Sequence, residues 1–376
     1  MMNRWFFLML LCFGLLPAKG QQQYLLVGTY THTGSKGIYV YSFNPETGSL
    51  DWVSNTDSIA NPSFLAVTRD KKFVYACTDS RTPNAGSVSA FSFDIATGQL
   101  RFINKHPTGG FNPVHIAVHE SGKWVITANY TGGTISVFPI SGDGSLQPFA
   151  QDVKLQGSSM NKERQEGSHV HSTVFSPDYK FLYAPDLGTD KVMQYQFNTS
   201  VSTPLSPLPI ASVAALPGSG PRHFTFHPKG MYAYLIEELS GAITAYGYNK
   251  KTGMLNPFQR MATHPADSTG PFGSAGIHIS PDGKFLYASN RGTENNIAIF
   301  SINQTNGKSV LKGFHSSLGL HPRNFTLDKS GNYLLVANML SDTIVVFKRN
   351  VRSGFLTATG VTIKVPQPSC LEMISF

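Results

Sequence analysis

The chain is poor in charged residues, and this shortage limits the structural classes to which it can belong. Charged side chains make up 14% of the 376 residues, well below the roughly 25% of ordinary soluble domains. Aromatic residues reach 12%, and 35 glycines and 23 prolines punctuate the sequence. These values exclude an intrinsically disordered chain, a coiled coil and a protein of long helices. We expect many short strands joined by tight turns instead.

Cysteine is scarce as well. Outside the amino-terminal segment only Cys77 and Cys370 occur, and there is no CxxC pair and no cysteine–histidine spacing of a zinc site. The pattern therefore predicts no metal site. One long-range disulfide is one interpretation, and two buried thiols are the interpretation we favour.

Only one long apolar run is present, Trp5 to Leu16, just after Arg4. It is too short to span a bilayer, and Ala18-Lys19-Gly20 has the small-x-small pattern of a cleavage site. We therefore expect residues 1–20 to be a signal peptide, with export to the periplasm or the extracellular space. The alternative is an uncleaved anchor; after cleavage no membrane contact is expected.

The positive charges do not cluster. The net charge is +8, and two of the positive charges, Arg4 and Lys19, lie within the expected signal peptide. No run of five or more basic residues occurs. A nucleic-acid partner is therefore not expected. A modest positive field instead favours anionic small molecules.

One sequence pattern recurs along the chain at intervals of roughly 50 residues. Each copy has a short alternating strand, a turn of the Asp-Gly-Lys type, a β-rich strand, a polar loop and two further strands. The copies begin at Pro62, Pro113, Val170, Pro221, Ser274 and Pro322. Four strands in a unit of this length are typical of a β-propeller blade.

A seventh copy is split between the two ends. Residues 24–50 carry its later strands, and residues 367–373 match its missing opening strand. The sequence thus predicts an all-β fold, a seven-bladed β-propeller of four-stranded antiparallel blades. Its ring is closed by the amino- and carboxy-terminal strands, which share one blade. Residues 21–376 are expected to form this one domain.

Histidine and arginine gather at equivalent positions of the repeat. The first strand of each blade lines the central channel of a propeller, and these strands carry His115, His171, Arg222, His223 and Arg323 near their starts. In the loop after the second strand, the Asn or Asp is expected to cap the turn. Glu238 and Arg291 follow that cap directly. A carboxylate, guanidinium groups and a histidine at one channel mouth suit hydrolysis.

Several motifs together resemble the seven-bladed lactonase family, which includes propeller-type 6-phosphogluconolactonases and the fungal carboxymuconate lactonizing enzyme. The motifs are Gly28-Thr29-Tyr30-Thr31, Asn112-Pro113-Val114-His115, His169-Val170-His171, Asp186 to Val192, Gly220-Pro221-Arg222-His223, Ser289-Asn290-Arg291-Gly292 and Pro322-Arg323-Asn324-Phe325. The resemblance implies a metal-independent, cofactor-free site for a small-molecule lactone in the central channel. It places the catalytic histidine on His171 (or His169), the carboxylate on Glu238 and two arginines on Arg222 and Arg291. One departure is Gly276, where relatives commonly carry an acidic residue.

Lactone hydrolysis needs a base for the attacking water and donors for the oxyanion. Glu238 or His171 is expected to be the base, and Arg222 or Arg291 the oxyanion donor. The other arginine, with Arg323, is expected to bind a carboxylate or phosphate, so the substrate is expected to be anionic. No Ser lies in a G-x-S-x-G setting, so no acyl-enzyme is indicated.

We assign substrate binding to His169, His115, His223 and Arg323, with packing as the alternative for His115 and His223. The favoured function is a hydrolase that opens a sugar-derived lactone by water attack in the central channel. Two other functions remain open: a non-catalytic propeller that binds a ligand or a protein, and a cycloisomerase of muconate type. One propeller scaffold hosts all three.

Overall fold

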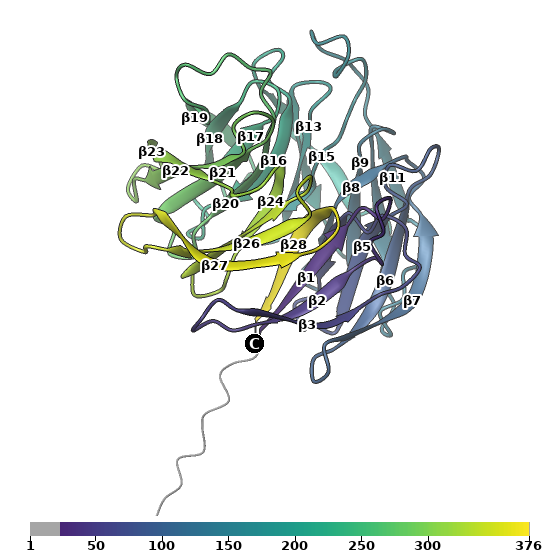
Figure 1. Cartoon of the computed structure of the whole chain (residues 1–376). Coiled ribbons are helices and arrows are strands. Elements are labelled where there is room, and N and C mark those ends of the chain that lie inside the picture. Colours follow the sequence, from purple (N-terminus) through teal and green to yellow (C-terminus); the bar gives the residue numbers. More distant parts are fainter. Residues whose placement is uncertain (1–22, 376) are drawn as a thin grey trace, which may run out of the picture.

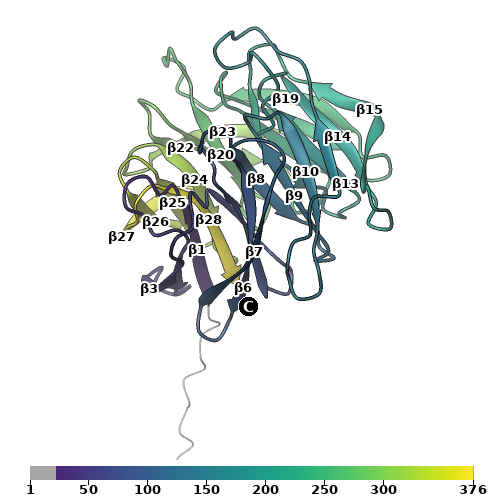
Figure 2. The same ribbon diagram turned by 90° about the vertical axis from the view of Figure 1, so that its right-hand side faces the viewer.

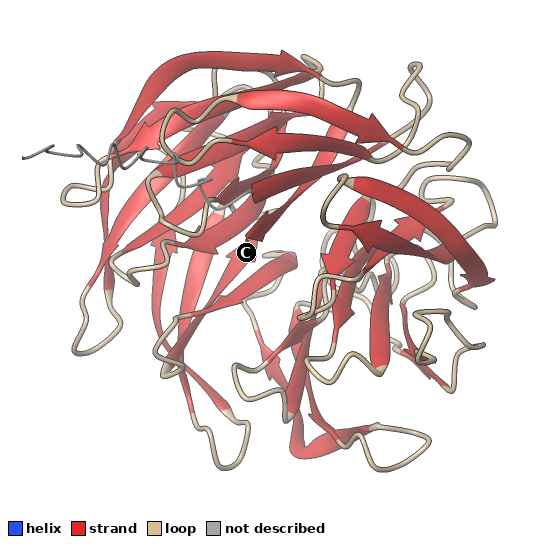
Figure 3. Cartoon of the chain, turned by 90° about the horizontal axis from the view of Figure 1, so that it is seen from below, coloured by secondary structure: helices blue, strands red, loops and turns tan. Residues whose placement is uncertain are grey.

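The computed structural model describes residues 23–375, which form strands and turns without any helix (Figure 3). The predicted signal peptide, residues 1–20, lies outside the described residues. Within residues 23–375, no helix is long and apolar enough to cross a membrane. The strands assemble into seven sheets of four antiparallel strands each, arranged as blades in a ring (Figure 1). The predicted seven-bladed β-propeller is confirmed.

The blades are numbered 1 to 7, and their strands run from the channel outward. Blade 1 contains β28 (Pro368–Ser375), β1 (Gln23–Thr29), β2 (Tyr39–Phe43) and β3 (Leu50–Asn55), and blade 2 contains β4 (Phe64–Val67), β5 (Phe73–Thr78), β6 (Ser87–Asp94) and β7 (Gln99–Pro107). Blade 3 contains β8 (Pro113–Val118), β9 (Trp124–Asn129), β10 (Thr134–Pro139) and β11 (Gln151–Lys154), and blade 4 contains β12 (Val174–Phe175), β13 (Phe181–Asp186), β14 (Lys191–Phe197) and β15 (Leu205–Ala214). Blade 5 contains β16 (Pro221–Phe226), β17 (Tyr232–Glu237), β18 (Ala242–Tyr248) and β19 (Leu255–Ala262). Blade 6 contains β20 (Ser274–Ile279), β21 (Phe285–Asn290), β22 (Asn296–Ile302) and β23 (Ser309–Ser316), and blade 7 contains β24 (Pro322–Leu327), β25 (Tyr333–Asn338), β26 (Thr343–Arg349) and β27 (Leu356–Lys364).

Burial follows the position of a strand within its blade. The second strands β9, β13, β21 and β25 are buried along their whole length, because neighbouring blades cover both of their faces. The outermost strand β27 instead alternates between half-buried and exposed residues. Continuous apolar runs in the sequence therefore become middle strands, and alternating runs become blade edges.

A repeated hydrogen bond joins one blade to the next. A buried tyrosine of the second strand donates its hydroxyl to a glycine carbonyl in a turn of the following blade. The four pairs are Tyr75–Gly144, Tyr183–Gly253, Tyr234–Gly307 and Tyr287–Gly354. These glycines all have φ between 70° and 84°, a left-handed conformation that side-chain-bearing residues rarely adopt.

The two ends of the chain complete blade 1. Strand β28 pairs with β1 from Gln23↔Ser375 to Thr29↔Pro368, and Figures 1 and 2 both show the two strands side by side. This pairing confirms the split seventh copy read from the sequence. Cys77 and Cys370 are both buried free thiols, so the disulfide interpretation is wrong and the thiol interpretation is confirmed.

Candidate active site

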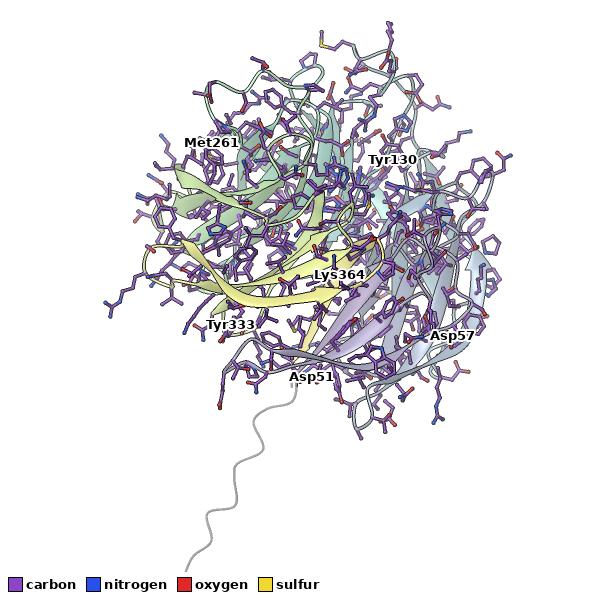
Figure 4. All side chains as sticks on the ribbon, in the orientation of Figure 1. Asp51, Asp57, Tyr130, Met261, Tyr333 and Lys364 are labelled. Carbon is purple, nitrogen blue, oxygen red and sulfur yellow. The ribbon has the colours of Figure 1, made fainter. Side chains whose placement is uncertain are left out.

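The predicted site residues gather at the end of the channel where first strands begin and second strands end. Tyr130, which follows β9, marks this end in the upper part of Figure 4, whereas Tyr333, at the start of β25, lies in the lower part. First-strand starts and second-strand ends meet there because the two strands are antiparallel. Residues from several blades therefore converge on one mouth.

A β-bulge at the start of the first strands directs the key arginines. In blade 5, Pro221 pairs with Glu237 and His223 with Ile236, so Arg222 has no partner across the ladder. The same shift leaves Arg323 unpaired between Pro322 and Asn324. A bulge re-aims its extra residue and is common beside active sites.

The loops after the second strands are held by buried polar side chains. The Asp186 carboxylate accepts hydrogen bonds from the backbone N–H groups of His169 (2.7 Å) and Gly188 (3.0 Å). Glu237 is fully buried and accepts bonds from Thr244 and Arg260. Asp186 therefore caps its loop, as the sequence predicted, whereas these hydrogen bonds of Glu237 join the end of β17 to β18 and β19.

Glu238 stands at the centre of the cluster, and its side chain is only 7% exposed. Its Oε2 atom accepts hydrogen bonds from Arg222 Nε (2.8 Å) and lies 3.0 Å from Arg291 Nη2. Its Oε1 atom accepts a bond of 2.7 Å from Arg164 Nη2. Burial alone would raise the pKa of this carboxyl, but the charges of Arg291 and Arg222 outweigh burial and hold the pKa well below its usual range.

His171 is the histidine that faces this carboxylate. Its Nε2 atom lies 3.9 Å from Glu238 Oε2, a contact rather than a hydrogen bond. Its Nδ1 atom is buried without a hydrogen-bond partner. Burial, with the nearby charge of Arg222, holds the pKa of His171 well below its usual range, so the ring is neutral at pH 7.

His169 points elsewhere. Its Nε2 atom lies 3.0 Å from Glu166, its Nδ1 atom lies 2.9 Å from the carbonyl oxygen of Tyr130, and its ring stacks on the Tyr130 ring at 4.5 Å. The strand is irregular here, because Val170 forms only an isolated bridge before the two-residue β12. The two histidines therefore have different surroundings, and His171 is the one that reaches the cavity.

The cluster lines a cavity of about 360 Å³ at the channel mouth. Of the predicted site residues, His171, Glu238, Arg291 and Arg323 are on its wall. The remaining lining residues are Tyr30, Arg81, Asn112, Val114, Tyr130 and Arg164. The wall is thus strongly cationic around one carboxylate.

Several lining residues were not predicted. Arg164 comes from the long connection between β11 and β12, which has no counterpart in the other blades; the signal for it was the unusually long interval between the copies at Pro113 and Val170. Tyr30 contacts Arg323, whose Nη2 donates to the Tyr30 hydroxyl at 2.9 Å. The Arg81 guanidinium lies 4.0 Å above the Tyr30 ring.

Four predicted residues lie off the cavity wall: Arg222, His169, His115 and His223. Arg222 is 1% exposed, and its Nη1 donates to the carbonyl of Ala275 in blade 6 at 2.7 Å. It therefore orients Glu238 and joins two blades. His169, His115 and His223 lie off this wall, so their substrate-binding roles stay predictions.

His115 and His223 belong to a cluster of aromatic rings that contacts His171. Their ring centroids are 5.6 Å apart, and Phe64 lies 4.4 Å from His115. The His223 ring also meets His171 edge-on at 5.3 Å. Burial lowers the pKa of His115 to about 3 and holds the pKa of His223 well below its usual range, so both rings are neutral at pH 7.

Gly276, the departure from the family pattern, is buried in the first strand of blade 6. A Cβ atom here would lie 3.1 Å from the Phe325 ring and 3.4 Å from Ser289 Oγ. A side chain at this position would therefore require the Phe325 ring to shift by a few tenths of an ångström.

A larger cavity of about 730 Å³ lies at the opposite end of the blades, between the turns near Arg69 and Glu120. It lacks the histidine and the buried carboxylate, so we place the candidate site at the cationic mouth despite its smaller volume. Within residues 23–375, no group of three or more His, Cys, Asp or Glu side chains could hold a metal ion.

The chain matches the family model described as lactonase, 7-bladed beta-propeller, over residues 24–373. It belongs to this family, which confirms the resemblance drawn from the motifs. A 6-phosphogluconolactonase of Formosa agariphila is 39% identical over 355 residues, which cover 94% of this chain and 99% of that protein.

Two solved structures are also similar. A putative 6-phosphogluconolactonase of Bacteroides fragilis has a TM-score of 0.90 at 40% identity, and covers 95% of this chain and 99% of its own. The periplasmic gluconolactonase of Pseudomonas aeruginosa has a TM-score of 0.89 at 34% identity, with coverage of 94% and 99%.

Proposed function

We propose that this protein hydrolyses a sugar-derived lactone in the cavity at the channel mouth. The observation that carries the proposal is the buried Glu238 carboxylate, ringed by arginines and 3.9 Å from a neutral histidine on the cavity wall. Family membership and relatives named 6-phosphogluconolactonase support the reaction class.

His171 suits the role of base better than Glu238 does. The arginine contacts hold the pKa of Glu238 well below its usual range, which makes this carboxylate a weak base. Burial also lowers the pKa of His171, but its ring is neutral at pH 7, whereas both oxygens of Glu238 already accept hydrogen bonds from arginines. We therefore assign the proton to His171, which takes it as the water oxygen bonds to the lactone carbonyl carbon. Glu238 then stabilises the imidazolium that forms.

The remaining steps use the cationic wall. Arg291, which lines the cavity, donates to the oxyanion of the tetrahedral intermediate. The ring C–O bond breaks, and His171 returns its proton to the ring oxygen. The product is the open-chain acid, whose carboxyl proton goes to solvent. Arg222 has no free path to the substrate and acts by positioning Glu238.

Arg323 and Arg81, which flank Tyr30, form a second cationic region on the wall. We propose that they bind an anionic or strongly polar substituent of the lactone. With a signal peptide on residues 1–20, the enzyme acts outside the cytoplasm, where a non-phosphorylated sugar lactone is the expected substrate. The printed name of the Pseudomonas aeruginosa relative, a periplasmic gluconolactonase, supports this choice.

The test is hydrolysis of glucono-δ-lactone and its 6-phosphate by the mature protein, with and without a chelator. We expect turnover of the unphosphorylated lactone at an undiminished rate with the chelator present. Glu238→Gln should lower kcat/KM by roughly 10²–10³-fold. The control is Glu120→Gln, which changes an exposed carboxylate at the far end of the blades. No turnover of either lactone would favour the binding propeller.

A further inference from the structure

A second cavity adjoins the candidate active site. Its volume is about 310 Å³, and Arg81 and Asn112 line both cavities. Its other walls include Thr82, Asn84, Phe111 and Thr131. The two spaces therefore share one boundary, which lies on the side of the active-site cavity formed by Arg81 and Asn112.

Hydrogen bonds join the loops that build this second cavity. The Arg81 N–H donates to the Asn112 side-chain oxygen at 3.0 Å, and the Asn112 amide donates to Thr131 Oγ1 at 3.2 Å. The backbone N–H of Asn112 donates to the Ala85 carbonyl at 3.1 Å. Three loops from blades 2 and 3 are thereby tied together, so the cavity is formed before any ligand binds.

Three of its lining residues have left-handed backbones. Arg81 has φ 57°, Asn84 has φ 53° and Asn112 has φ 54°. Asparagine tolerates this region, but for arginine it is uncommon, and such conformations persist where surrounding contacts enforce them, often beside ligand sites. The backbone here is held in a defined shape.

The chemistry of the second cavity suits a neutral sugar. Phe111 is 43% exposed and presents an aromatic face, against which the C–H face of a pyranose ring packs. Thr82, Thr131 and Asn84 carry hydroxyl and amide groups that both donate and accept hydrogen bonds, as sugar hydroxyls require. Arg81 is the only charged side chain among the described residues that line it.

We propose that the second cavity is a subsite for a further sugar ring, so that the substrate class includes lactones of oxidised disaccharides. This inference rests on the proposed function, since the lactone ring itself would occupy the neighbouring cavity at His171 and Glu238. The sugar attached to it would cross the shared boundary at Asn112 and pack on Phe111.

The test compares glucono-δ-lactone with cellobiono-δ-lactone as substrates of the full chain. For each protein, kcat/KM on the disaccharide lactone is divided by kcat/KM on the monosaccharide lactone. Phe111→Ala should lower this ratio roughly five- to tenfold, the usual worth of one aromatic packing contact. The matched control is Phe355→Ala, which removes a phenylalanine of nearly equal exposure (42%) in blade 7 and should leave the ratio unchanged.

Binding of the product acids separates failure of the subsite from failure of the proposed function. If no lactone is hydrolysed, the proposed function is wrong, and the affinities for gluconate and cellobionate, measured by calorimetry, still decide the subsite. Tighter binding of cellobionate, lost in Phe111→Ala, supports it. An equal response of both acids or both lactones to Phe111→Ala, or cellobionate binding no tighter than gluconate, overturns it.

Discussion

The buried carboxylate of Glu238 forms ion pairs with three guanidinium groups, and these ion pairs bear on the role of the neighbouring His171. Arg222, Arg291 and Arg164 all lie within 3.0 Å of one of its oxygens. A carboxylate paired in this way stays ionised and offers a fixed negative charge, which suits stabilisation of a protonated His171 more than proton abstraction. The sequence predicted both residues for the site and left open which of them is the base, and we propose that His171 is the base and that Glu238 stabilises its charge.

A buried arginine–glutamate ion pair should contribute more to stability than an exposed pair with nearly the same N–O distance. Arg222–Glu238 and Arg69–Glu120 have nearly the same N–O distances, 2.8 and 2.9 Å, but the arginine side chains are 1% and 78% exposed. Arg222→Met should therefore lower the free energy of unfolding by about 3 kcal/mol, because it leaves a buried charge partly uncompensated. Arg69→Met should cost less than about 1 kcal/mol. Urea denaturation measures both, and equal losses would contradict this account.

The buried histidines should make stability depend on pH. Burial lowers the pKa of His115 to about 3, from an ordinary value of 6.5. Between these values the unfolded chain binds the proton and the folded chain does not, so stability is full above pH 6.5 and falls as the pH drops toward 3. In His115→Phe the slope of unfolding free energy within this window should be smaller by up to about 1.4 kcal/mol per pH unit. Parallel pH profiles for wild type and variant would refute the assignment.

At the scale of strands and turns, the sequence predicted the repeating strands but not the β-bulges or the positions of Arg164 and Tyr30 in the site. The recurring first and second strands were visible because their alternation and spacing repeat from blade to blade. The β-bulges that direct Arg222 and Arg323 were not, since a bulge depends on how two strands pair and leaves no mark in a single strand. Arg164 was missed because its loop repeats nowhere else, and Tyr30 because its motif was noted without its contact to Arg323.

The hydrogen bonds from tyrosine hydroxyls to glycine carbonyls of the next blade can be tested by substitution of the tyrosine. Tyr234 donates to the Gly307 carbonyl at 2.7 Å inside the core, whereas Tyr232 donates to Thr305 at 2.8 Å in an exposed position. Tyr234→Phe should cost about 1–2 kcal/mol of unfolding free energy, because it leaves a buried carbonyl unpaired. Tyr232→Phe should cost less, since water replaces the lost donor. The comparison fails if the two variants are equally stable.

At the scale of the whole molecule, the ring depends on the strand that closes it. The sequence predicted this closure, because each end carried the part of a blade that the other lacked. Strand β28 supplies the innermost strand of blade 1 and pairs with β1 along its length. It also packs against the first strands of blades 2 and 7, so it holds three blades together.

Deletion of residues 368–376 should therefore abolish cooperative folding, because it removes the inner strand of one blade and exposes the edge of β1. Circular dichroism and thermal melting of the truncated chain are the measurements. A soluble truncated protein with the melting temperature of the full chain would show that the ring does not need its closing strand.

The central claim is that His171 and Glu238 act as one unit in lactone hydrolysis. The most direct measurement is a double-mutant cycle of kcat/KM on glucono-δ-lactone, with His171→Asn, Glu238→Gln and the double variant, each checked for folding by thermal melting. We predict that each single variant loses roughly 10²-fold or more and that the double variant is hardly worse than either, because removing one partner already disables the other. Losses that multiply in the double variant would mean that the two residues act independently and would contradict the account.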